Sequence, residues 1–435
     1  MSRAKTLFHY VLPSVCGQLC IFLFTIVDGI FVGRGVGETA LGAVNIILPF
    51  ILILNALYML TAVGGATVTA IRLGRGDTEG ANLAFLHSLT ALLATAAVLT
   101  MVGVGLTESL GYLLGANAVY INDVKDYLFW YSAFILPSAL GMLLQFFVRN
   151  DGSPVLVMAA TGVSSGLNIF LDWLFVFPLK QGVAGAAIAT GISQTVSFLM
   201  LAGHFLRKRG VLRVKRFRFD QRLLKKILMR GAPEAVAQFA SPVSILCLNY
   251  VLLARIGEVA VNAFSVICYT ASFSVAVFYG VSEGMQPLIG QAYGEKNTEN
   301  LRYYFRTSLA ISFLGSLAVY GLLWALDAPI CRLFGVTGET LEYTVSKMPA
   351  YAFSFVFMSL NTIISAYLYS TKRTKAAVTL NLLRSFAFTI AAILLLPVLF
   401  GTGIVWYTAA IYEAASLLTA AALVCWTERN GIAYR

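Results

Sequence analysis

The sequence predicts an all-α membrane protein with twelve transmembrane helices in two pseudo-symmetric six-helix lobes. Three observations predict this fold: the composition, the length of the apolar segments and an internal repeat. Hydrophobic residues make up 59% of the 435-residue chain, charged residues make up only 12%, and the mean hydropathy is +0.80. Because a soluble core could not bury that much apolar surface, we expect the chain to lie in lipid.

The apolar segments are too long and too numerous for the strands of a transmembrane barrel, so helices are expected. The expected spans are residues 10–33, 43–71, 84–106, 127–148, 155–178, 183–206, 231–254, 262–292, 306–326, 347–370, 376–400 and 403–427.

The chain repeats itself at a constant offset of 220 residues. GETALGA at 37–43 returns as GEVAVNA at 257–263, and GRGDTE at 74–79 returns as GEKNTE at 294–299. Because each half has six spans, each half enters and leaves the membrane on the same side. The two halves are therefore parallel repeats. Duplicated, strongly hydrophobic chains of this kind usually carry solutes across membranes.

Charge predicts the orientation of the spans. Twenty-four of the 31 Lys and Arg residues fall on the side of the N-terminus. The positive-inside rule therefore predicts a multi-pass protein of the cytoplasmic (inner) cell membrane with both termini in the cytoplasm. The net charge of +11 is then a topology signal, and no nucleic-acid partner is expected.

A basic tract divides the chain into an N-lobe (1–206), a cytoplasmic linker (207–230) and a C-lobe (231–435). The linker carries eleven Lys and Arg residues and is expected to face anionic membrane lipid. The sequence contains no hydrolase, nucleotide-binding or metal-binding motif, so we expect neither an enzyme nor a resident metal or cofactor.

Two acids lie within predicted spans of the N-lobe, where each carboxylate costs about 2.5 to 3.5 kcal/mol. Asp28 and Asp172 are expected at the same depth, near the outer ends of their helices. Asn168 lies one turn from Asp172 on the same face, and Thr190 lies at a similar level. These oxygens could bind a proton or Na⁺. The alternative is that the acids only join helices through hydrogen bonds.

Four segments carry a resemblance to a known family: VDGIFVGRGVGETALGAVNI at 27–46, NIFLDWLFVF at 168–177, GVAGAAIATGISQ at 182–194 and GVSEGMQPLIGQAYGEKN at 280–297. They resemble the multidrug and toxic compound extrusion (MATE) family. The resemblance implies twelve helices in two lobes and export of small organic cations against an inward flow of H⁺ or Na⁺. We expect the protein to act as a monomer.

The same resemblance implies that the coupling cation binds Asp28, Asn168, Asp172 and Thr190. Some family members also bind a cation in the C-lobe through a Tyr and an Asp four residues apart. Here the aligned positions are Phe357 and Asn361, which argues against a C-lobe sodium site of that kind.

Charges in the C-lobe spans suggest two further roles. Arg384 is expected to form a structural ion pair, with Glu413 as its partner. That pairing would leave Glu283 for a cationic substrate.

Tyr279, Phe278 and Met285 could add apolar and cation–π contacts to the substrate. Glu234 is a weaker substrate candidate, because it follows a proline at the expected start of its helix, where it could cap that helix.

Two other classes of function remain open. A lipid-linked oligosaccharide or lipid flippase of the same superfamily would also have two homologous lobes, but with a more cationic cavity. A channel or a non-transporting scaffold would tolerate loss of the membrane acids.

Overall fold

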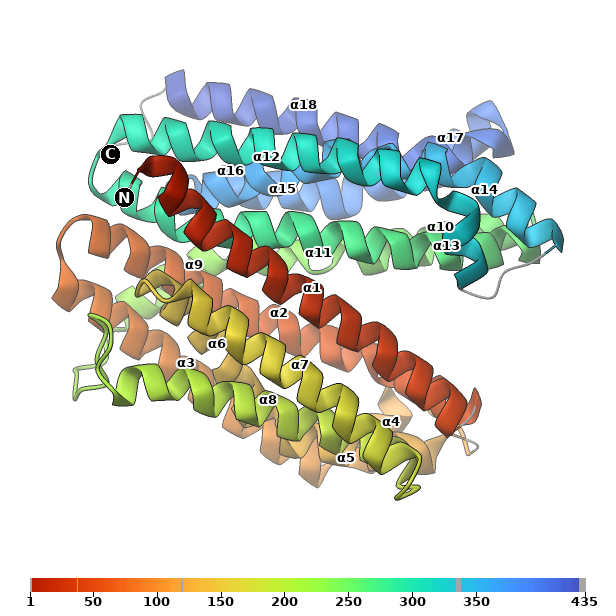
Figure 1. Ribbon diagram of the computed structural model, residues 1–435, viewed down its shortest axis with the longest axis horizontal. Helices are drawn as coiled ribbons and strands as arrows, with labels where there is room; N and C mark the ends of the chain where they lie inside the picture. The colour runs from red at the N-terminus through yellow and green to blue at the C-terminus, as the bar shows by residue number, and fades with distance from the viewer. Residues whose placement is uncertain (1, 37, 119, 334–337, 430–435) are drawn as a thin grey trace. The chain divides into compact units, whose positions relative to one another are not determined.

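The computed structural model describes residues 2–36, 38–118, 120–333 and 338–429. Every regular element in these ranges is helical (Figure 1). In the described part of the chain, eleven helical segments are long and apolar enough to cross a membrane, and the number is twelve if one bent pair is taken as a single span. The predicted all-α membrane fold with twelve spans is confirmed.

The chain forms two compact units. One comprises Phe8–Gly231, and the other comprises Met1–Leu7 together with Ala232–Arg435. The residues expected to form a linker, 207–230, belong to the first unit. Only the first part of this stretch is irregular, because a helix starts at Gln221.

The first unit contains α1 (Arg3–Gly35) from Phe8 onward, α2 (Glu38–Gly74), α3 (Thr78–Gly105), α4 (Thr107–Leu113), α5 (Ile121–Ala133), α6 (Ile135–Asn150), α7 (Pro154–Val176), α8 (Gly182–Leu206) and the start of α9 (Gln221–Ala237). α7 packs along α8, α2 packs along α3, and α6 contacts α8. Buried Val32, Ile47, Leu128 and Val176 bring α1, α2, α5 and α7 into one apolar cluster.

The second unit contains α10 (Ala240–Arg255), α11 (Glu258–Gly294), α12 (Thr298–Ala325), α13 (Asp327–Leu333), α14 (Gly338–Ala352), α15 (Ser354–Ser370), α16 (Thr374–Leu382), a π-helical turn (Leu383–Phe388), α17 (Thr389–Phe400), a 3₁₀ turn (Thr402–Tyr407) and α18 (Thr408–Arg429). α11, α12, α15 and α18 run side by side (Figure 1).

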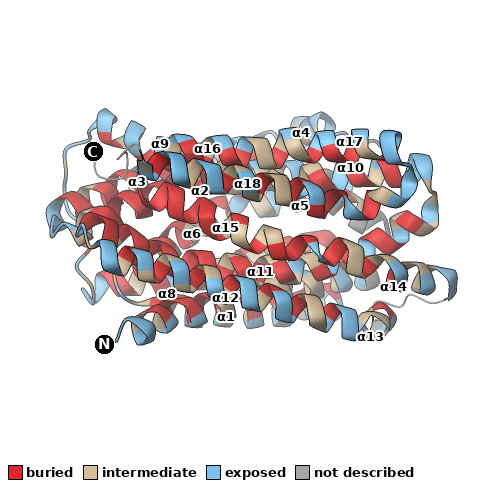
Figure 2. Ribbon diagram, turned by 90° about the horizontal axis from the view of Figure 1, so that it is seen from above, coloured by how far each residue is buried: buried red, intermediate tan, exposed pale blue. Residues whose placement is uncertain are grey.

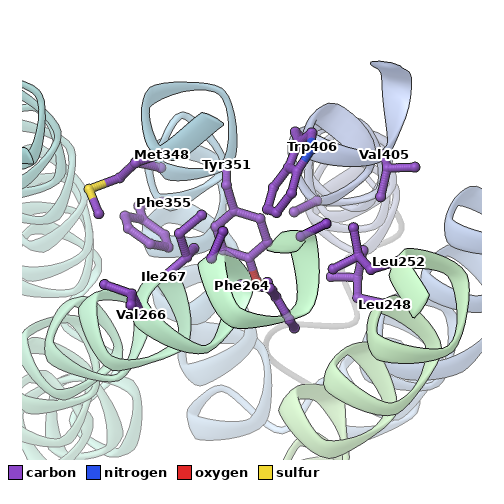
Figure 3. Close-up of a cluster of buried hydrophobic side chains, with 14 of the residues drawn as sticks. Leu248, Leu252, Phe264, Val266, Ile267, Met348, Tyr351, Phe355, Val405 and Trp406 are labelled. Carbon is purple, nitrogen blue, oxygen red and sulfur yellow. The ribbon is translucent and has the colours of Figure 1, made fainter. Parts of the chain in front are cut away.

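An aromatic cluster forms the core of the second unit. The ring of Phe264 packs edge-on against Tyr351 and Trp406, with centroids 5.7 and 6.5 Å apart (Figure 3). Leu248 and Leu252 of α10 complete the same cluster. Edge-to-face aromatic pairs fix the orientation of neighbouring helices as well as burying area.

Small side chains let α12 approach its neighbours closely. Ser308, Ser312 and Ser316 recur every four residues on the buried face of the helix, while its opposite face is exposed (Figure 2). Since lipid gives no hydrophobic drive to helix association, close packing at such small residues supplies much of it.

Three predicted spans differ most from the observed helices, and others start or end a few residues away. Span four, expected as one helix over 127–148, is a pair of helices bent by 51° at Phe134. Span seven, expected to start at 231, begins at Gln221 instead. Span ten, expected from 347, begins at Gly338 and breaks at Phe353. In each case apolar periodicity continues through a break or into polar flanks, which a hydropathy count does not resolve.

Candidate functional site

A pair of carboxyl groups lies inside the first unit. Asp172 is completely buried on α7, and Asp28 is partly buried on α1. Their side chains lie within hydrogen-bonding reach of each other, so one proton could be shared between them. The depth matching made from the sequence therefore corresponds to a side-chain contact.

The amide and hydroxyl expected at this level are joined to each other. The Nδ2 of Asn168 donates to the Oγ1 of Thr190 over 3.2 Å, linking α7 to α8. Asn168 is buried, and it lies one turn before Asp172 on the same helix face. The structure thus joins Asp28 to Asp172, and Asn168 to Thr190.

Four oxygen atoms of this group are buried without a described hydrogen-bond donor. Both carboxylate oxygens of Asp172, one of Asp28 and the Oδ1 of Asn168 are buried, and no donor from the described residues reaches them. Buried acceptors are normally satisfied, because an unmade hydrogen bond is costly away from water. A proton or a small hard cation is the chemical complement of such a set.

Tyr127 of α5 is a nearby residue that the sequence reasoning missed. It is buried, and the charges of Asp28 and Asp172 both act on its hydroxyl. Its ring stacks on Tyr131, one turn along α5, with the centroids 6.0 Å apart. The two tyrosines at helical spacing in a predicted span were the available signal, but aromatic residues at that spacing are common in cores.

In the second unit, two of the membrane charges form an ion pair. Arg384 and Glu413 form an ion pair with 2.9 Å between Nη2 and Oε1, and the Nε of Arg384 donates to the same carboxylate. Asn361 donates to Oε2 of Glu413 over 2.7 Å. The position where some relatives are expected to bear an Asp thus holds an amide that donates to this acid.

Arg384 is the second residue of an irregular turn. It lies in the π-helical stretch Leu383–Phe388, and its carbonyl accepts from the Oγ1 of Thr389 over 2.6 Å. Such single π turns widen the helix and re-aim a side chain, and they occur often at functional positions.

Glu234 does not cap a helix, so that part of the expectation is wrong. It lies inside α9, because the helix starts at Gln221 and continues through Pro233. Its buried carboxylate accepts from the hydroxyl of Tyr279, and Gln238 donates to it over 3.3 Å. A carboxylate held by two donors, one from the turn after α9 and one from α11, is an organised polar site.

A small cavity opens beside this carboxylate. Its volume is about 60 Å³, against roughly 300 Å³ or more for a site that holds a whole drug-sized ligand. Its lining residues are Glu234, Ala237, Ala240, Ser241, Val275, Phe278, Tyr279, Ser282, Met358, Thr362, Ser365, Asn381 and Arg384.

The five predicted substrate contacts therefore separate into two groups. Glu234, Phe278 and Tyr279 line the cavity. Glu283 and Met285 are buried on α11 and are not among its lining residues. The charge of Glu283 nevertheless acts on Glu234, so the two acids share one polar region. Among the described residues, no cluster of three or more His, Cys, Asp or Glu side chains could hold a metal ion.

Comparisons with known proteins agree with this architecture. The MatE family model matches residues 13–174 and again residues 233–402, so the repeated matches begin at the same offset as the internal repeat. The multidrug export protein MepA of Staphylococcus haemolyticus is 24% identical over 408 residues, covering 92% of this chain and 89% of that protein. MepA of Staphylococcus aureus strain MSSA476 is 24% identical over 428 residues, covering 97% and 92%.

Solved structures show the same fold. A crystal structure of MATE in complex with MaL6 superposes with a TM-score of 0.91 at 24% identity, covering 99% of this chain and 96% of that one. A mutant of the Vibrio cholerae MATE transporter VcmN gives 0.91 at 21% identity, covering 99% and 98%. With the family model matching well over half of its residues, the chain belongs to the MatE family of multidrug and toxic compound extrusion transporters.

Proposed function

We propose that this protein is a secondary active exporter of cationic or amphipathic organic compounds that exchanges them for H⁺ or Na⁺ by alternating access. One observation carries the proposal: Asp28 and Asp172 lie within hydrogen-bonding reach inside a membrane-spanning unit, with buried oxygens that no described donor reaches. The names of the MepA relatives, which are multidrug export proteins, support the substrate class. We further propose that it acts as a monomer in the cytoplasmic membrane with both termini inside.

The coupling cation would bind in the first unit. A proton would be shared by Asp28 and Asp172, whereas Na⁺ would also use the Oδ1 of Asn168 and the hydroxyl oxygen of Thr190. Buried Tyr127 lies near the pair and would form part of the wall of this site. Either ion removes the mutual repulsion of two carboxylates in a low-dielectric environment.

The organic cation would contact the second unit. Glu234 supplies a carboxylate, and Tyr279 and Phe278 supply aromatic faces beside the cavity. Because the cavity in this structure is about 60 Å³, it could admit an ammonium group but not a whole drug molecule. The remainder of the substrate would then need the larger space of another conformation.

Coupling follows from differential affinity. The ion would favour a form that holds substrate poorly, and substrate would favour a form that holds the ion poorly. When the exported compound is uncharged, one cation moving inward gains about 2.3 kcal/mol per 100 mV, which sustains a roughly fiftyfold substrate gradient before any ion gradient is added. One-for-one exchange with a monovalent organic cation moves no net charge, so the ion gradient alone would drive it.

Flux in proteoliposomes tests the proposal. Uptake or efflux of a fluorescent organic cation would be followed with an imposed proton gradient, then with a sodium gradient. We expect gradient-driven flux for the native protein, and the level of protein-free vesicles for Asp28→Asn and for Asp172→Asn.

The matched control is Glu79→Gln, which removes an exposed carboxylate from the same unit. It should transport normally. Native flux and native ion counterflow in both Asp variants would show that the acids only join helices, and flux without ion dependence would indicate a channel.

A further inference from the structure

The basic segment after α8 is fixed to the first unit by its backbone. We call residues 207–220 the strap. The buried carboxylate of Asp151 accepts from the backbone N–H of Val211 over 2.7 Å and from that of Leu212 over 3.3 Å. The other oxygen of Asp151 lies 2.9 Å from Nε2 of buried His204, and the side chain of Leu212 is completely buried.

Two more contacts hold the rest of the strap. The Oδ1 of buried Asn82 accepts from the backbone N–H of Arg213 over 2.6 Å. The backbone N–H of Asp220 donates to Nε2 of His87 over 2.8 Å, and the ring of Phe217 packs on that imidazole at 4.8 Å. The strap is therefore held at residues 211–213 and again at residues 217–220.

A close backbone approach makes the first contact possible. A Cβ added at Gly210 would collide with the carboxylate of Asp151. Glycine is thus the residue that allows the strap to reach this anchor.

The strap exposes both basic and apolar side chains. Its exposed cationic side chains are Arg207, Lys208, Arg209, Lys215, Arg216 and Arg218. Exposed apolar side chains alternate with them: Val211 is 52% exposed, Val214 66% and Phe219 51%. Aliphatic and aromatic groups among cations are typical of segments that lie in the headgroup region of a bilayer.

Like charges also gather where α9, which follows the strap in sequence, packs near the end of α2. The charges of Arg72 and Arg75, at the end of α2, act on Lys226 of α9, as does that of Arg230. Holding cations together costs free energy unless anions approach them.

We propose that the strap is a binding surface for the headgroups of anionic phospholipids. Its positive charge complements phosphate diesters, and its exposed Val214 and Phe219 reach the boundary of the acyl chains. A loop whose charge served only to orient the helices would need no fixed backbone. Three separate anchors instead present these side chains in a preorganised array, which lowers the entropy cost of binding.

Lipid association measured on the full-length protein tests the proposal. The protein would be reconstituted in phosphatidylcholine bilayers containing spin-labelled phosphatidylglycerol or, separately, spin-labelled phosphatidylcholine. The quantity compared is the ratio of the two association constants. We expect the native protein to prefer phosphatidylglycerol.

The variant Lys215→Gln/Arg216→Gln/Arg218→Gln should lose most of that preference, since each charge near the surface contributes up to about fivefold. The matched control, Lys296→Gln/Arg302→Gln/Lys375→Gln, removes the same number of exposed charges from the second unit and should keep the preference. Gly210→Ala keeps every charge but displaces the strap, and it should also lower the preference.

Three results would overturn the proposal. The first is a native protein with no preference for phosphatidylglycerol, and the second is equal loss in the two triple variants. The third is full displacement of the lipid by inorganic phosphate, which would indicate a site for the free ion. If Gly210→Ala does not fold, the two triple variants still decide the question.

Discussion

The two units place different chemical groups at the same contact between helices. In the first unit, the Oγ of Ser164 on α7 donates to the backbone carbonyl of Ser193 on α8 over 2.8 Å. At the repeat offset of 220 residues, these positions become Arg384 and Glu413, which form the buried ion pair of the second unit. Duplication kept the contact between the fifth and sixth spans and changed the groups that make it.

The acids of the first unit have no charged counterparts at the equivalent positions of the second unit. Asp28 and Asp172 correspond to Leu248 and Ala392 in the second unit, where both positions are buried and apolar. The first unit therefore places two like charges together without a described cation beside them, while the second pairs its acid Glu413 with a cation. Charge compensation, rather than charge itself, separates a structural pair from a candidate ion site.

The turns, in contrast, are conserved in geometry across the repeat. Asp77 caps α3 by accepting from the N–H of Gly80 over 2.8 Å, and Asn297 caps α12 by accepting from that of Asn300 over 3.0 Å. The residue before each cap has a positive φ, 73° at Gly76 and 57° at Lys296. The two halves of the repeat therefore share the backbone geometry of the turns before α3 and α12.

The largest effect should come from leaving the acid of the second unit uncompensated. Arg384→Met keeps the apolar stem but removes the charge beside buried Glu413. We expect the free energy of unfolding to fall by about 3 to 5 kcal/mol. Ser164→Ala, the change at the equivalent position of the first unit, should cost about 1 kcal/mol. Thermal and denaturant unfolding of the purified variants would measure both.

The double variant Arg384→Met/Glu413→Met tests whether an uncompensated Glu413 causes the loss of stability. Removing both charges should restore most of the stability, because well-packed apolar residues can replace a buried pair. A double variant as unstable as the single one would mean that Arg384 stabilises the unit through contacts other than Glu413.

Much of the fold could be predicted from the sequence because lipid imposes simple rules. Spanning segments must be helical and apolar, so their number follows from composition and length. The start of α9 could not be predicted in this way. Its first residues, from Gln221 to Arg230, are strongly basic, and only the buried Leu223 and Ile227 show which face packs.

The site was predictable only in part, for a similar reason. A carboxylate in a membrane helix is costly, so Asp28, Asp172 and Arg384 stand out in any hydropathy analysis. Tyr127 does not stand out in this way, because a tyrosine does not interrupt the apolar pattern of a predicted span. Glu234 was misjudged because a proline before an acid is typical of a helix start, and here it lies in a helix interior.

Removing the two caps should give equal, smaller losses. Asp77→Ala and Asn297→Ala each leave one N–H of a first helical turn without its side-chain partner. We expect each change to lower the free energy of unfolding by about 1 kcal/mol. The same unfolding assay measures both, with Glu79→Gln as the control in the helical turn that Asp77 caps. A loss confined to one unit would contradict the view that the repeat kept equivalent turns.

The smallest effect should come from exchanging the residues that precede those caps. Lys296 adopts the left-handed conformation in which a side chain is strained, whereas its counterpart Gly76 adopts it freely. Lys296→Gly should therefore stabilise the second unit by about 0.5 to 1 kcal/mol, the relief of strain being partly offset by the greater freedom of the unfolded chain. Gly76→Lys should destabilise the first unit by a similar amount. Because both residues are exposed, neither change disturbs packing, and opposite shifts in unfolding temperature would isolate the backbone term. Shifts of the same sign would show that the two turns, although alike in dihedral angle, are held by different contacts.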